Sequence, residues 1–170
     1  MTAKTSLLIA SLFALVPAAA IPVAAHAETP AGYVAKAGAG DLYEETSSKL
    51  VLRSTKDATV RAFATMMVRD HNKSTAMVKA AAAKSHLKVG PPHMSAEQKA
   101  NVAALTKATG AARDQLYWEQ QKTAHAQALA LHQGYATSGT AQPLKAAAAK
   151  IAPVVQKHID SLDSGMHAHN

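Results

Sequence analysis

The stretch VRAFATMMVRDH, residues 60–71, decides the fold class of this chain. An α-helix turns 100° per residue, and on that wheel several apolar side chains lie within about 40° of His71. These side chains are Val60, Ala64, Met67 and Val78. Because this spacing is typical of a helix with one buried face, the segment predicts an amphipathic helix whose core-facing stripe carries a histidine.

The rest of the chain has the same helical character. It is rich in alanine, a strong helix former, and no alternating strand pattern bounded by turns is visible. Glycine, proline, serine and threonine divide it into four long helices and one short helix, expected at about 31–53, 56–86, 96–108, 111–135 and 141–162. Short connections favour antiparallel neighbours, so we expect an all-α, ferritin-like, up-down four-helix bundle with one additional short helix.

Two helix starts carry specific signals. Ser54 and Thr55 break the first helix, and either can cap the second, with Asp57 favourable in that first turn. Ser95 and Gln98 have the spacing of a capping box, which opens the short helix.

The N-terminal residues have the pattern of a secretory signal peptide. Lys4 supplies a positive charge, residues 7–16 are apolar, and Ala25-His26-Ala27 matches the small-x-small pattern that signal peptidase recognises. An uncleaved anchor is the alternative, but Pro17 and Pro22 interrupt the apolar stretch, and a spanning helix needs about 20 apolar residues. We expect cleavage after Ala27 and a periplasmic product without a transmembrane segment. The whole chain then divides into residues 1–27 (signal peptide), 28–165 (helical bundle) and 166–170 (flexible tail).

Composition narrows the classes of partner and chemistry. The chain has no cysteine, which excludes thiol catalysis, iron–sulfur clusters, thiolate zinc sites, disulfides and a lipid anchor on cysteine. It carries 18 basic and 11 acidic side chains. The lysines are spread along the helices and aromatic side chains are scarce, so we expect no nucleic-acid partner and at most weak contact with anionic envelope components. The sequence does not determine the oligomeric state.

Histidines recur on the inward faces of the expected helices. On the last helix, five apolar residues lie within about 40° of His158, and His125 shares a more polar face of the preceding helix. On the first helix, Glu44 lies on a face of mostly small residues. Imidazole and carboxylate groups suit Fe, Zn, Cu or Mn, and helical bundles build metal sites from inward side chains. The candidate ligands are therefore Glu44, His71, His125 and His158.

A purely structural interpretation stays open beside the metal site. Buried histidines also form ordinary hydrogen bonds across helices, and the candidate partners for this role are Asp70, Asp114, Tyr117 and Glu44. In a metal site, Asp70, Asp114 and Tyr117 would orient the rings. Counted from the turns, Glu44 and His71 differ in height by about 5 Å, and His125 and His158 by about 9 Å, so one shared shell is not guaranteed.

Several segments together resemble an exported bacterial family, the domain of unknown function numbered four-one-four-two, often labelled a predicted outer-membrane protein. The resemblance spans nearly the whole mature chain, and the Met-x-x-Asp-His pattern of residues 67–71 is its most specific part. It implies a ferritin-like helical bundle and association with the outer membrane. It also implies that the family's characteristic polar positions are Glu44, Asp70, His71, Asp114, Tyr117, His125 and His158.

These observations favour a non-enzymatic binding or stress-associated protein of the periplasm, which holds a transition metal in an interior cluster of histidine and glutamate. The alternative is a structural or interaction module of the cell envelope, with the histidines as core hydrogen-bonding groups. A redox enzyme with a di-metal centre is less favoured, because the chain lacks the paired Glu-x-x-His motifs of di-iron bundles.

Overall fold

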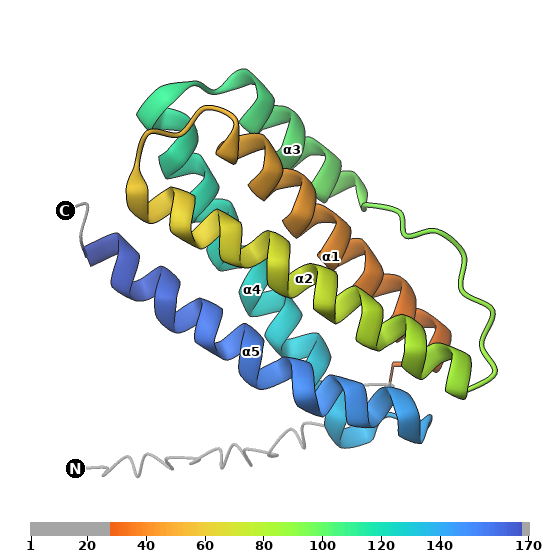
Figure 1. Ribbon diagram of the computed structural model, residues 1–170. Coiled ribbons are helices and arrows are strands. Elements are labelled where there is room, and N and C mark those ends of the chain that lie inside the picture. The colour runs from red at the N-terminus through yellow and green to blue at the C-terminus, as the bar shows by residue number, and fades with distance from the viewer. Residues whose placement is uncertain (1–27, 168–170) are drawn as a thin grey trace, which may run out of the picture.

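The computed structural model describes residues 28–167, with side chains up to residue 165, and these form five helices without a strand (Figure 1). The expected signal peptide, residues 1–27, lies outside the described residues, as do positions 168–170 of the expected tail. The prediction of an all-α bundle with one short additional helix is confirmed. The helices are α1 (Pro30–Leu52), α2 (Ala58–Lys84), α3 (Ala96–Lys107), α4 (Gly110–Ser138) and α5 (Gln142–His167).

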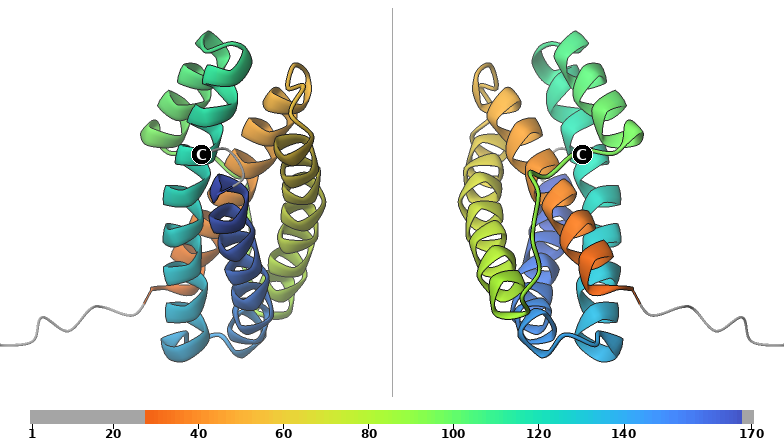
Figure 2. Two further views of the ribbon diagram at one scale, coloured as in Figure 1. Left: turned by 90° about the vertical axis from the view of Figure 1, so that its left-hand side faces the viewer. Right: turned by 90° about the vertical axis from the view of Figure 1, so that its right-hand side faces the viewer.

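The four long helices form a ring in which every neighbouring pair is antiparallel. α1 packs on α2 and α4 on α5, and the two hairpins join through α2 with α5 and α1 with α4 (Figures 1 and 2). α2 and α4 run in the same direction, because an extended loop and α3 carry the chain back along the bundle between them. α3 therefore lies outside the ring, against α1 and α4.

Local capping explains where α2 and α3 begin. Ser95 and Gln98 form the expected capping box at the start of α3. The prediction that Ser54 or Thr55 caps α2 is wrong, since Asp57 is the N-cap and accepts hydrogen bonds from the backbone at positions 59 and 60. The Thr55 hydroxyl instead donates to Asp114 at 2.8 Å, which ties the α1–α2 turn to α4.

The core consists of two apolar clusters separated by a polar layer. One cluster gathers around Tyr33, Val78 and Leu144, and the other around Phe63 and Leu162. Between them along the helices lie the buried polar side chains Asp41, Glu44, Ser47, Ser48, His71, Ser74, Gln120, Gln121, His125 and His158. Burying polar groups costs free energy unless they are paired, so the two apolar clusters must stabilise this layer.

No helix of the described chain is both long enough and apolar enough to cross a membrane.

Candidate metal centre

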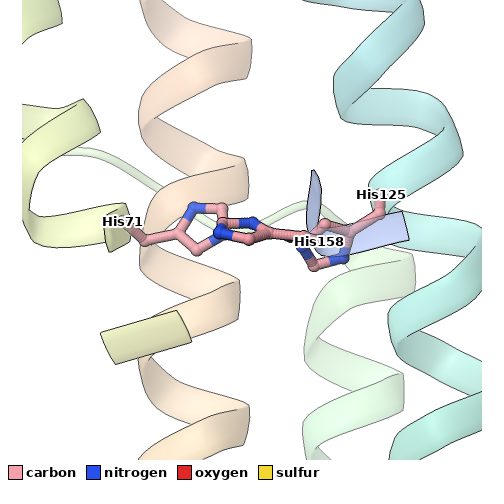
Figure 3. A group of neighbouring side chains, drawn as sticks. All are labelled: His71, His125 and His158. Atoms are coloured by element: carbon pink, nitrogen blue, oxygen red, sulfur yellow. Dashed lines mark hydrogen bonds between the residues drawn. The ribbon is translucent and has the colours of Figure 1, made fainter. Parts of the chain in front are cut away.

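Three histidines from three helices meet in the polar layer. His71 of α2, His125 of α4 and His158 of α5 point toward one another (Figure 3). Each offers one ring nitrogen to a group in which all three nitrogens lie within 4.8 Å of one another. The three residues are at most 5% exposed, so their rings are part of the buried interior.

Each ring is held through the nitrogen that does not face the cluster. Nδ1 of His71 lies 2.8 Å from Oδ1 of Asp41, and Nδ1 of His125 lies 2.9 Å from the carbonyl oxygen of Gln121. Nε2 of His158 lies 3.2 Å from Oδ2 of Asp70. Carboxylate and carbonyl oxygens only accept, so all three of these nitrogens carry the proton and donate. In a neutral ring the remaining nitrogen then presents a lone pair to the centre.

His125 and His158 bring two unprotonated ring nitrogens close together. Nε2 of His125 and Nδ1 of His158 lie 3.3 Å apart, and each is the nitrogen left without a proton by the bonds just described. Two facing lone pairs at this distance repel unless a proton or a metal ion lies between them. The geometry therefore calls for a positive charge at the centre of the cluster.

The buried surroundings of His125 and His158 disfavour a proton as the positive charge between them. Burial lowers the pKa of His125 to about 3, and burial also lowers the pKa of His158 to about 4. For His71 burial acts in the same direction, but the hydrogen bond from its ring to Asp41 and the nearby charges of Glu44 and Asp41 outweigh it and raise the pKa. The rings of His125 and His158 are therefore neutral at neutral pH.

Glu44 lies beside the three rings and is the carboxylate nearest to them that is not hydrogen-bonded to one of them. Its Oε1 is 3.8 Å from Nδ1 of His125, too far for a hydrogen bond, and its Oε2 has no hydrogen-bond partner. Nε2 of His71 is likewise buried without a hydrogen-bond partner. Burial raises the pKa of Glu44 to about 7. A buried carboxylate oxygen and a buried imidazole nitrogen without hydrogen-bond partners are uncommon in proteins, which makes these two side chains candidates for binding.

Of the three orienting residues expected from the sequence, the structure brings only Asp70 to a histidine. Asp114 accepts the Thr55 hydroxyl at 2.8 Å, and the Tyr117 hydroxyl pairs with that of Ser48 at 2.7 Å. Neither forms a hydrogen bond with the three rings, because both precede His125 on α4 by two to three turns and lie nearer the end of the bundle.

Asp41 is the residue of the candidate site that was not expected from the sequence. It is 4% exposed, and its two carboxylate oxygens accept from His71 and from the Thr75 hydroxyl. A signal was present, since Asp41 precedes Glu44 by three residues and so shares its helix face.

The register of the helices explains this pairing. Asp41 lies 11 residues before the end of α1, and His71 lies 13 residues after the start of α2, a height difference of about 3 Å. Glu44 lies 8 residues before that end, which leaves about 7.5 Å to His71. The carboxylate level with His71 is therefore that of Asp41, and Glu44 sits to one side.

The expected 9 Å offset between His125 and His158 is wrong. α4 continues to Ser138, about one turn beyond its expected end, so His125 lies 13 residues before the end of α4 and His158 lies 16 residues after the start of α5. Three residues correspond to about 4.5 Å, which the two side chains span.

Comparison with known proteins identifies a structure with a similar fold and the family of the chain. A crystal structure of DUF305 from Streptomyces coelicolor, described as a secreted protein, matches with a TM-score of 0.66 and 16% identity over 80% of this chain and 89% of that chain. At this identity the likeness concerns the fold alone. No curated protein matches the chain in sequence. Residues 15–164 match the family described as Domain of unknown function (DUF4142), and the chain belongs to this family.

Proposed function

We propose that this protein is an exported, non-enzymatic metal-binding bundle that holds one transition metal ion between His71, His125 and His158, with Glu44 beside it. The observation that carries the proposal is the pair of facing ring nitrogens of His125 and His158, 3.3 Å apart with their protons directed elsewhere. A divalent cation between them replaces a repulsion with two bonds.

The donor set favours a particular class of ion. Neutral imidazole suits Zn, Cu, Fe and Ni, whereas Mg and Ca take oxygen ligands. Three histidine nitrogens with one further position is the usual arrangement of an open zinc site. Bonds of about 2.0–2.1 Å around a tetrahedral ion place nitrogens roughly 3.3 Å apart. The nitrogens of His125 and His158 already have this spacing, and the nitrogen of His71 lies within 4.8 Å of both.

The location in the periplasm is part of the same proposal. It is supported by the signal-peptide pattern of the N-terminal residues and by the exported family that the sequence resembles. The structural neighbour from Streptomyces coelicolor, which is described as secreted, is consistent with it. Because the chain has no cysteine, an oxidising compartment would form no disulfide in it.

Metal content with and without the central ring tests the proposal. The metal-free protein is loaded with Zn²⁺ or Co²⁺, excess ion is removed, and the bound ion is measured by elemental analysis. We expect about one ion per chain, because the three rings form one site. His71→Ala should lower the affinity by more than the roughly 10- to 100-fold that loss of an outer partner costs.

His93→Ala is the matched control, because His93 is an exposed histidine outside the cluster. It should bind metal like the wild type, and circular dichroism establishes that each variant is folded. Wild-type protein that binds no ion, or a loss in His93→Ala equal to that in His71→Ala, would overturn the proposal. The histidines would then be core hydrogen-bonding groups of an envelope interaction module, a role that the bonds to Asp41 and Asp70 also satisfy.

A further inference from the structure

A cavity leads from the surface to one side of the histidine cluster. It has a volume of about 490 Å³ and lies between α1, α3 and α4, where we name it the α1–α3–α4 chamber. Its lining includes Gly40, Asp41, Glu44, His71, Gln120 and Ala124. A volume of this size is within the range of small-molecule sites, roughly 300–1,000 Å³.

Two residues of the polar layer that carry unpartnered buried atoms line the chamber. Both Glu44 and His71 line it, and Glu44 Oε2 and His71 Nε2 are buried without a hydrogen-bond partner. The two side chains are 3% and 5% exposed, so bulk water does not replace the missing bonds. The chamber is thus lined by one residue whose carboxylate oxygen lacks a donor and by one whose imidazole nitrogen lacks a partner.

The side chains that line the chamber favour ligands of a particular charge. Four acidic residues line it, namely Glu28, Asp41, Glu44 and Glu97, against one lysine, Lys36, which is paired with Glu28. His158 is reached from a different side, where a cavity of about 350 Å³ between α2 and α5 is lined by Arg69, Lys73 and Lys157. The acidic chamber favours cations and neutral molecules over anions.

A ligand that fits Glu44 and His71 needs two features. It must have a lone pair for the metal ion, and it must have an N–H or O–H group to donate to Glu44. Resting on the metal centre proposed above, we infer that the chamber admits a small neutral molecule of the azole or alcohol class to a coordination position of the ion between His71 and Glu44.

Imidazole and azide distinguish this ligand class on the cobalt-loaded protein. At about pH 8, above the pKa of roughly 6.5 of an imidazole ring, imidazole is mostly neutral and still carries an N–H group. We expect imidazole to change the visible spectrum of bound Co²⁺ in a saturable way, with azide at least about tenfold weaker, since the acidic wall opposes an anion. Cobalt content measured after the titration shows that the ion stays bound.

Filling the chamber gives the structural test. Gly40 lines the chamber, and a Cβ atom added there meets nothing within 4 Å, so we expect Gly40→Leu to fold and to fill part of the chamber. We expect this variant to bind cobalt with the wild-type spectrum and imidazole at least about tenfold more weakly, because the added side chain takes the ligand's space. Ala124→Leu fills the same chamber from α4 and provides a second, independent variant.

Gly134→Leu is the matched control, since this helical glycine also has open space around it but is exposed and lies away from the chamber. Wild-type binding of imidazole by both filled variants, or azide binding as tight as that of imidazole, would contradict the inference. Wild-type protein that binds cobalt but not imidazole overturns this inference alone. Failure to bind cobalt at all overturns the metal centre itself.

Discussion

At the scale of the residue, the histidine cluster depends on one carboxylate in particular. Asp41 accepts from Nδ1 of His71 at 2.8 Å and from Thr75 at 3.0 Å, and this leaves Nε2 of the ring for the centre of the cluster. We expect Asp41→Asn to weaken metal binding by about 10- to 100-fold, because an amide holds and polarises the ring less strongly than a carboxylate. A competition titration against a chromophoric chelator measures this change.

Glu45→Gln is the control for that substitution. Glu45 also lies on α1, but its side chain is paired with Lys49 at 2.6 Å and is not part of the cluster. It should leave metal affinity unchanged. Equal affinities of Asp41→Asn and the wild type would show that the aspartate does not orient the ring.

At the scale of the element, the start of α2 is set by a single side chain. Oδ1 of Asp57 accepts from the backbone N–H groups of Thr59 and Val60 at 2.8 and 2.9 Å. Asp57→Ala removes both bonds and should lower the free energy of unfolding by about 1 kcal/mol. Urea denaturation of the metal-free protein followed by circular dichroism measures this loss.

The start of α4 offers the comparison for this substitution. Thr109 is the N-cap of α4, yet its side chain forms no capping hydrogen bond. Thr109→Ala should therefore change the free energy of unfolding by only a few tenths of a kcal/mol. If the two alanine variants lost the same stability, the capping bonds of Asp57 would not be what stabilises α2.

At the scale of the whole molecule, a buried histidine outside the polar layer makes stability depend on pH. His132 is 4% exposed and its Nδ1 lies 3.0 Å from the Tyr33 hydroxyl, while Asp41 and His71 are the charged groups that act on it. Burial lowers the pKa of His132 to about 4. The unfolded chain takes up a proton below about 6.5, whereas the folded chain does not until about 4.

The contribution of His132 to stability is therefore complete above pH 6.5 and is lost as pH falls toward 4. The shift in pKa corresponds to about 3 kcal/mol of stability. The variant His132→Gln has no titrating ring at this position and should not show this dependence on pH. We expect the difference in free energy of unfolding between wild type and His132→Gln, both metal-free, to shrink over this range in urea titrations. His86→Gln, at an exposed histidine, should follow the wild type at every pH. A constant difference for His132→Gln would contradict the shift.

The sequence by itself determined the helices and the inward face of most of the site residues. Apolar side chains around His71 and His158 recur with the period of a helix, and this period depends only on local geometry. Capping at Ser95 is equally local, since the bonds span three residues. Glu44 was found for the same reason, as it lies on the buried face of α1.

Only the tertiary structure decided which inward groups meet. The level of a side chain in the bundle depends on where each helix ends and on the offset between packed helices, and neither is periodic in the sequence. A longer α4 brought His125 and His158 to 3.3 Å, and the register of α1 on α2 placed Asp41 rather than Glu44 against His71. Which ring nitrogen faces the centre follows from those neighbours, because a proton goes to the nitrogen that has an acceptor.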